Sequence, residues 1–167
     1  MIINASGNIV EQDGKFLLVQ EGRKEFPGKW NLPCGELDSG ESIVACAARE
    51  GKEETGYELE VVAWVGQYQQ LQWSVFGGHD LVVNVFNSKI VGGEKTVPSD
   101  LLDVAWFSFE EICEMAIKKE LLHLYVLHTI ATHRERMAKI ISSEKREKNI
   151  PIESGHFRIY PSNSGHS

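Results

Sequence analysis

The pattern of apolar and polar positions at the start of the chain predicts a β-hairpin. Residues 8–12 and 15–19 are short runs rich in β-branched and aromatic side chains, and the Asp-Gly pair between them is a strong signal for a two-residue turn. Residues 21–29 are polar and broken by proline and glycine, so we expect a loop there. A short extended stretch follows over residues 30–33.

The pattern turns helical after residue 38. Asp38 or Ser39 can cap the helix, Glu41 lies in its first turn, and Gly56 stands where a left-handed C-terminal cap is expected. Gly51 inside the helix costs about 1 kcal/mol relative to alanine. Together these signals predict a helix from Glu41 to Thr55. Its apolar positions recur at helical spacing, and they are Ile43, Val44, Ala47 and Ala48.

Strand-like alternation returns after Tyr57. Three runs rich in Val, Trp and Phe predict three strands, with Gly77-Gly78 as the turn between the last two. A polar loop then leads to a further strand and to a short helix that Ser108 caps. The expected strands are residues 59–67, 71–76, 81–90 and 104–107, and the short helix runs from 109 to about 116.

The last third of the chain predicts one long amphipathic helix over residues 120–141 and then a polar tail. Helices and strands intermix without regular βαβ alternation, which favours an α+β fold, a sandwich with a mixed β-sheet and a C-terminal helical extension. We therefore expect one domain over residues 1–142 that includes the long helix, and a polar tail over 143–167 whose end is poorly ordered.

Composition narrows the class of protein. No run approaches the ~20 apolar residues of a membrane-spanning helix, and the first residues lack the pattern of a signal peptide, so we expect a cytoplasmic protein. Three cysteines without metal-ligand spacing argue against a disulfide framework. The net charge of -7, from 17 basic and 24 acidic residues, makes a nucleic acid polymer an unsuitable partner. If the protein handles phosphate, metal ions held by its carboxylates should mediate the contact.

A cluster of glutamates on the first predicted helix is the main candidate for chemistry. Glu50, Glu53 and Glu54 are spaced i, i+3 and i+4, which places them within about 60° of one another on one helix face. Like charges this close repel, and a divalent cation such as Mg²⁺ resolves the conflict because it prefers carboxylate oxygens. The alternative is a solvated acidic face with Arg49 and Lys52 as local counter-charges.

The wider spacing favours the metal site. Gly35, five residues, Glu41, seven residues and then Arg49-Glu50-Gly51-Lys52-Glu53-Glu54-Thr55-Gly56-Tyr57 resembles the Nudix signature, in which every glycine, glutamate and arginine is matched. Two positions depart from it. Gly51 and Tyr57 stand where bulky aliphatic residues are usual, and both are packing positions rather than ligands.

The resemblance implies a fold and an activity. It implies an α/β/α sandwich around a loop-helix-loop motif, and hydrolysis of a nucleoside diphosphate derivative or a related organic pyrophosphate. Mg²⁺ is the expected cofactor, with Mn²⁺ as a substitute. By resemblance, Glu53 and Glu54 are principal metal ligands together with the Gly35 carbonyl. Glu50 is a further ligand or the base that deprotonates water.

The same resemblance assigns supporting roles. Arg49 orients the carboxylates, and Glu41 pairs with Arg49 to brace the motif. The substrate itself is not determined, because the loops outside the signature match no subgroup. A non-catalytic ligand-binding or regulatory module that kept the fold remains the alternative function.

Several residues outside the motif are candidates for contacts with substrate. Trp30 and Trp73 could stack on a ring of the substrate, as could Phe26 and Tyr68, although core packing explains such residues equally well. The resemblance also implies that a loop outside the motif can supply an extra acidic residue. Glu94 and Asp100 are the positions to consider, although as solvated loop residues they need no function.

The cysteines, the histidines and the basic end of the last helix give weaker evidence about function. The cysteines are best explained as packing residues, and Cys34 has no neighbouring base that would activate it. His123, His128 and His133 are five residues apart, so they rotate around a helix and form no metal face. The C-terminal helix could instead support a homodimer, and its basic end could attract an anionic partner.

Overall fold

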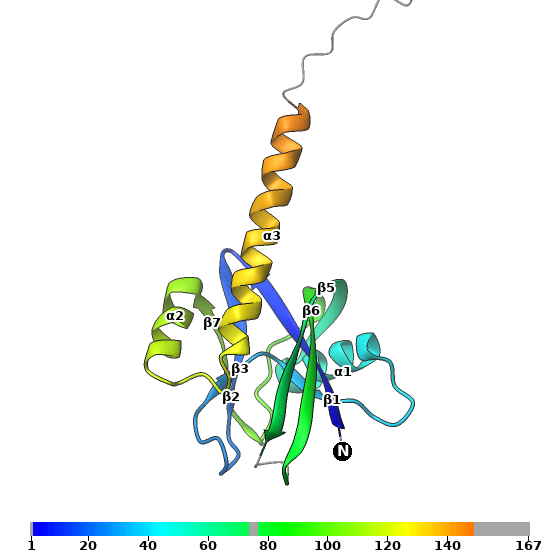
Figure 1. The fold of residues 1–167 in the computed structure, drawn as a ribbon, viewed down its shortest axis with the longest axis vertical. Coiled ribbons are helices and arrows are strands. Elements are labelled where there is room, and N and C mark those ends of the chain that lie inside the picture. The colour runs from blue at the N-terminus through cyan, green and yellow to red at the C-terminus, as the bar shows by residue number, and fades with distance from the viewer. Residues whose placement is uncertain (1, 74–76, 149–167) are drawn as a thin grey trace, which may run out of the picture. The chain divides into compact units, whose positions relative to one another are not determined.

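The computed structural model describes residues 2–73 and 77–148, and within them it has seven strands and three helices (Figure 1). In chain order they are β1 (Ile2–Gln12), β2 (Lys15–Glu21), β3 (Trp30–Asn31), β4 (Cys34–Glu36), α1 (Ile43–Thr55), β5 (Tyr57–Trp73), β6 (His79–Gly93), β7 (Leu101–Ser108), α2 (Phe109–Ile117) and α3 (Tyr125–Lys148).

Strand β1 joins the two halves of a mixed sheet. It forms the predicted hairpin with β2, and both turn residues, Asp13 and Gly14, have positive φ angles of 51° and 74°. Along most of its length β1 pairs in parallel with β6 instead. The strand order is β3-β2-β1-β6-β5, with β4 added on β1 and β7 on β2. The predicted mixed sheet is confirmed.

Both faces of the sheet are covered, as the side chains of β2 show. Phe16 and Leu18 enter a core cluster that also contains Ile112 of α2 and Ile130 of α3. The intervening residues point to the opposite face, where α1 packs against β1, β4 and β5. This arrangement confirms the α+β sandwich. The cluster on the second face consists of Val10, Leu17, Val19, Leu59, Leu101 and Val104.

Helix α1 begins later than predicted. The first helical residue is Ile43, and Ser42 is the N-cap, whose hydroxyl accepts the backbone N–H of Ala45 at 3.1 Å. Gly40 has a φ of 78°, which no residue of a right-handed helix adopts, so Glu41 precedes the helix. The predicted end is confirmed, because Gly56 caps the helix in the left-handed region with a φ of 80°.

The prediction of two separate strands over 59–67 and 71–76 was wrong. Strand β5 is continuous from Tyr57 to Trp73 and pairs with β6 throughout, including the intervening pairs Tyr68↔Val83 and Gln70↔Leu81. Local polarity suggested a break there, but β6 supplies backbone partners along the whole length, and register shifts absorb the irregularities. Residues 74–76 lie outside the described part of the chain.

The start of α2 agrees with the prediction, whereas the start of α3 does not. Helix α2 has the expected capping box between Ser108 and Glu111. Helix α3 begins at Tyr125 rather than at residue 120, because residues 120–122 run extended beside Trp30: the Trp30 N–H donates to the Glu120 carbonyl at 2.9 Å, and Leu122 N–H donates to the Trp30 carbonyl at 2.8 Å.

Helix α3 continues to Lys148, beyond its predicted end at Ile141. Among the described residues, 2–135 belong to one compact unit and 136–148 to a second. The predicted division at residue 142 remains a prediction, and residues 149–167 of the expected tail lie outside the described part. Among the described residues, no helix has both the length and the apolarity needed to cross a membrane.

Candidate active site

Arg49 is the centre of an ion-pair network on α1. Its Nε and Nη2 atoms donate to the two carboxylate oxygens of Glu41, both at 2.9 Å. Its Nη1 donates to Glu50 at 2.6 Å and to Glu53 at 3.2 Å. The hydrogen bonds from Arg49 lower the pKa of Glu41 to about 2, and those carboxylates in turn raise the pKa of Arg49. The predicted pairing of Glu41 with Arg49 is thus present in the structure.

A cavity of about 200 Å³ is lined by residues of α1, of several strands and of the start of α3. Gly35, Glu50 and Glu54 come together on its wall, so three of the four predicted metal-binding residues line one space. The other lining residues are Ala5, Glu21, Arg23, Asn31, Cys34, Glu36, Leu81, Val83, Asp100, Leu101, Leu122 and Tyr125.

Two carboxylates in this wall are poorly solvated. Burial raises the pKa of Glu54 well above its usual value, although the carboxylate accepts the backbone N–H of Cys34 at 2.8 Å. Burial also raises the pKa of Glu50, against the opposing effect of Arg49. Nearby like charges act in the same direction: the charge of Glu50 raises the pKa of Glu54, and the charge of Glu53 raises that of Glu50. A cation at this wall would relieve both effects.

Gly35 permits the close approach of loop and helix. A β-carbon at this position would lie 2.1 Å from Cδ of Glu50, so any side chain here would displace that carboxylate. The Gly35 carbonyl accepts a hydrogen bond from the Cys46 thiol at 3.5 Å. The wall therefore presents carboxylate oxygens, which are donors that Mg²⁺ prefers, and its residues fit such an ion.

Glu53 is held apart from this wall. Its side chain is 59% exposed, pairs with Arg49 and does not line the cavity. Among residues 2–73 and 77–148, no three acidic, histidine or cysteine side chains already converge as a metal site would require. Joint use of Glu50, Glu53 and Glu54 therefore needs rotation of Glu53 away from Arg49.

The aromatic residues predicted to contact the substrate lie mostly outside this cavity. Trp30 packs in the core with its ring centroid 4.6 Å from that of Phe107, and it does not line the cavity. The Trp73 side chain lies outside the described part. Tyr68 stacks on Tyr125 at 5.6 Å in an adjoining pocket, and Phe26 lies under the Arg23 guanidinium.

The two predicted loop carboxylates differ in their position relative to the cavity. Asp100 lines the cavity, whereas Glu94 does not. The backbone of Glu94 instead lies against the C-terminal cap of α1, where a β-carbon on Gly56 would be 2.2 Å from the Glu94 carbonyl oxygen.

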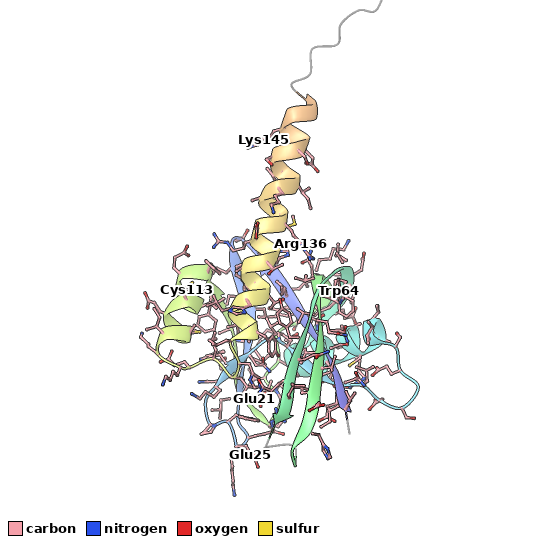
Figure 2. All side chains as sticks on the ribbon, in the orientation of Figure 1. Glu21, Glu25, Trp64, Cys113, Arg136 and Lys145 are labelled. Atoms are coloured by element: carbon pink, nitrogen blue, oxygen red, sulfur yellow. The ribbon has the colours of Figure 1, made fainter. Side chains whose placement is uncertain are left out.

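Sequence reasoning missed several residues of the cavity, among them Glu21, Arg23 and Tyr125. Glu21 ends β2 with a buried side chain (Figure 2) and forms a two-point ion pair with Arg23 at 2.9 and 3.0 Å. In the sequence both residues look like the start of a polar loop. Tyr125 lay within a predicted helix, and no local signal distinguished it from its apolar neighbours.

Tyr125 and Cys34 form a partly buried polar contact beside Glu54, with 3.7 Å between the Tyr125 hydroxyl and the Cys34 sulfur. The Tyr125 hydroxyl donates to Oδ1 of Asn31 at 2.9 Å, and the Asn31 amide donates to the Cys34 sulfur at 3.2 Å. Burial raises the pKa of Tyr125 and that of Cys34, so both stay protonated near neutral pH. A thiol that stays protonated is unsuited to nucleophilic attack, which agrees with the packing role expected for Cys34.

The geometry of Arg49 and its glutamates agrees with a comparison of whole sequences. The model of the NUDIX domain family matches residues 3–129, which is most of the chain. The chain belongs to the Nudix family. An ADP-ribose pyrophosphatase from Methanocaldococcus jannaschii is 30% identical over 116 residues, covering 70% of this chain and 68% of the relative.

Other relatives carry the Nudix domain within longer proteins. A putative Nudix hydrolase of Caenorhabditis elegans is 35% identical over 103 residues, and a human 8-oxo-dGDP phosphatase is 30% identical over 138 residues. The matches cover 60% and 80% of this chain, but only 26% and 40% of those relatives.

Solved structures give the same assignment. A Nudix hydrolase from Nitrosomonas europaea superposes with a TM-score of 0.72 at 27% identity, covering 81% of this chain and 90% of that one. A MutT protein from Methanosarcina mazei, at 24% identity and a TM-score of 0.67, shares the fold over 81% of this chain and 95% of its own. The recognition of the family from its signature is confirmed.

Proposed function

We propose that this chain hydrolyses a diphosphate linkage in a nucleoside diphosphate derivative or a related organic pyrophosphate, with Mg²⁺ as cofactor. The observation that carries the proposal is the cavity wall on which Gly35, Glu50 and Glu54 meet. It gathers oxygen donors where ionised carboxylates are poorly solvated, and a hard divalent cation stabilises such groups. Mn²⁺ suits the same donors.

We assign the roles expected from the Nudix signature to residues of this wall and to Glu53 beside it. Glu54 and the Gly35 carbonyl would hold the ion, and Glu53 would join them when its ion pair with Arg49 opens. Arg49 pairs directly with three glutamates. Among them, Glu53 has the longest contact, at 3.2 Å, and the most exposed side chain. An exposed pair of this kind contributes about 0–1 kcal/mol, so a cation can compete with it.

Glu50 is suited to accept a proton. When bound, Mg²⁺ would neutralise charge on the diphosphate and lower the pKa of a bound water. Burial raises the pKa of Glu50, which makes its carboxylate a stronger base than an exposed glutamate. The contact with Gly35 fixes one side of this carboxylate, and the 2.6 Å bond from Arg49 fixes the other. Either role for Glu50, ligand or base, uses the same position.

Relatives suggest which substrates to test first. Their names assign ADP-ribose hydrolysis to the archaeal protein and 8-oxo-dGDP hydrolysis to the human one, and another relative is named as a hydrolase of NAD-capped RNA. All of these reactions break a diphosphate linkage. Because this chain matches only part of the human protein, we propose the reaction class and leave the substrate to experiment.

The test is a screen for phosphate and nucleotide release over ADP-ribose, 8-oxo-dGDP, nucleotide sugars and dinucleoside polyphosphates, with Mg²⁺ or Mn²⁺. We expect turnover of at least one of them, and a loss of kcat of about 100-fold or more in Glu53→Gln and Glu54→Gln. Glu58→Gln is the matched control, because Glu58 pairs with exposed Lys52 and does not line the cavity. It should retain kcat within about twofold.

The alternative function, a non-catalytic binding module, makes a different prediction in the same screen. All compounds would remain intact with both cations, while one of them bound without being cleaved. Retention of near-normal activity by Glu53→Gln or Glu54→Gln would instead contradict the assigned roles within an active enzyme.

A further inference from the structure

The charges around the cavity are strongly unbalanced. Its lining includes five carboxylates but, within the described residues, a single basic side chain, that of Arg23. The proposed substrate is a polyanion, and a divalent cation offsets charge only near Glu50 and Glu54. The part of the cavity beside Arg23 therefore differs in charge from the rest. The five carboxylates belong to Glu21, Glu36, Glu50, Glu54 and Asp100.

The backbone around Arg23 is firmly anchored. The Glu21 N–H donates to the Lys29 carbonyl at 2.8 Å, and Gly28 N–H donates to the Glu21 carbonyl at 3.0 Å, which closes the loop between them. Gly22 N–H donates to the Asp100 carbonyl at 3.2 Å. A β-carbon on Gly22 would lie 2.5 Å from that carbonyl oxygen, so glycine is needed for this contact. Arg23 thus leaves the sheet from a fixed point.

The guanidinium group is fixed as well, yet only partly used. Its Nε and Nη2 atoms donate to the two oxygens of Glu21, whose side chain is 4% exposed, while the Arg23 side chain is 50% exposed. A guanidinium has five N–H donors, and Glu21 takes two of them. Within the described part of the chain, the other three donate to no acceptor on the protein. They are available at the cavity.

We propose that Arg23, held in place by Glu21, binds the second phosphoryl group of the substrate, while the first lies at the Glu50–Glu54 wall. The inference rests on the proposed function and adds the recognition of the second phosphate. Planar guanidinium donors match phosphate oxygens and form charge-assisted hydrogen bonds. Because Glu21 fixes the group before the substrate arrives, little side-chain freedom remains to be lost on binding.

The pairing with Glu21 also sets the selectivity of this position. The ion pair has no net charge, so its long-range attraction for a single phosphate is weak. Its free N–H groups can still donate hydrogen bonds to a phosphate oxygen that lies within reach. A compound with two phosphoryl groups should gain from Arg23, whereas a compound with one, held at the metal, should not. Glu21 is a positioning residue in this scheme, and Arg23 makes the contact.

The experiment measures the binding of two probes by calorimetry in the presence of Mg²⁺. Methylenediphosphonate has two phosphoryl groups and a bridge that is not hydrolysed, and methylphosphonate has one. We expect Arg23→Gln to raise the Kd of methylenediphosphonate by about tenfold, and that of methylphosphonate by no more than about twofold. Lys24→Gln removes the same charge from the neighbouring exposed residue and should change neither value.

A second variant separates binding from folding. Arg23→Gln alone leaves the buried Glu21 carboxylate without its partner, which can unfold the protein. Glu21→Gln/Arg23→Gln removes both charges, and measurement of its melting temperature tests whether it is folded. The double variant should show the same tenfold loss for methylenediphosphonate.

The outcomes distinguish this inference from the proposed function. If wild type binds methylenediphosphonate with Mg²⁺ and hydrolyses a substrate of the screen, but the folded Arg23 variants bind both probes normally, the role of Arg23 is wrong and the function stands. An equal loss for both probes would also overturn it, because it would indicate a general charge effect. If wild type binds neither probe and cleaves nothing, both proposals fail.

Discussion

Gly35 and Glu50 lie in such close contact that the strand and the helix that carry them admit no side chain between them. A β-carbon at residue 35 would be 2.1 Å from Cδ of Glu50 and 2.3 Å from each of its carboxylate oxygens. Gly35 does not have a positive φ angle, so alanine would not strain the backbone there. The glycine serves the position of the carboxylate.

Gly35→Ala should therefore separate activity from stability. The new methyl group would push the Glu50 carboxylate out of place by an ångström or more, and a misplacement of about 1 Å costs on the order of 100-fold in rate. We expect kcat to fall by about that factor. The melting temperature should change little, because the displaced atoms are the end of a flexible side chain. Steady-state kinetics and thermal unfolding check the two parts, and a kcat within threefold of wild type would contradict the role of Glu50.

Gly51→Ala should have the opposite effect. A β-carbon at residue 51 would lie 2.3 Å from Cδ1 of Leu59 and 3.3 Å from the Asn8 amide. Overpacking of a core costs about 1–3 kcal/mol, whereas alanine gains about 1 kcal/mol in helix propensity. The clash prevails, so we expect the melting temperature to fall by roughly 2–4 °C while kcat is retained. A more stable Gly51→Ala variant would show that Leu59 moves aside without cost.

These two glycines illustrate what the sequence could and could not predict. The signature identified Gly35 and the glutamates, because their spacing along the chain carries the chemistry. Gly51 looked like a weakness of the helix by local propensity alone. Residue 51 is a glycine because Leu59 of β5 packs closely against the helix there. This contact between distant segments cannot be predicted from the local sequence pattern. Secondary structure was predicted well where caps are local, as at Gly56 and Ser108.

The unpredicted features depend on distant pairing. Strand β5 is continuous because β6 supports it, and α3 starts at Tyr125 because Trp30 pairs with residues 120–122. The burial of Glu21 likewise depends on the pairing of the end of β2 with β7. In each case tertiary contacts override a local pattern that indicated a loop or a helix.

Glu54→Gln should stabilise the metal-free protein while it removes activity. Burial raises the pKa of Glu54, so its contribution to stability is present below the unfolded value of about 4.3 and is lost as pH rises through the folded pKa. At pH 8 the ionised group therefore destabilises the fold. Glutamine is neutral and can still accept the N–H of Cys34. We expect a melting temperature about 2–4 °C higher at pH 8 in EDTA.

Mg²⁺ supplies the internal check on this prediction. It should raise the melting temperature of wild type more than that of Glu54→Gln, because the ion relieves a repulsion that the variant lacks. Glu58→Gln, with its exposed carboxylate, should behave as wild type in EDTA and in Mg²⁺. Equal stabilisation of all three proteins by Mg²⁺ would place the cation away from Glu54.

Glu41→Gln should change the dependence of stability on pH in the acid range. The hydrogen bonds from Arg49 lower the pKa of Glu41 to about 2, below the unfolded value of about 4.3. A lowered folded pKa means that the stabilisation is present above pH 4.3 and is lost as pH falls toward 2. Wild type should thus exceed Glu41→Gln in stability at pH 6, and the two proteins should converge between pH 4.3 and 2.

Urea unfolding at steps between pH 2.5 and 6 measures this convergence, and a constant difference over the whole range would exclude the Glu41–Arg49 pair as its source. The same variant should need more Mg²⁺ for half-maximal activity. Without Glu41, the guanidinium of Arg49 loses its two-point partner and binds Glu50 and Glu53 more tightly. The cation must then compete for those two carboxylates against an arginine that has lost its main counter-charge.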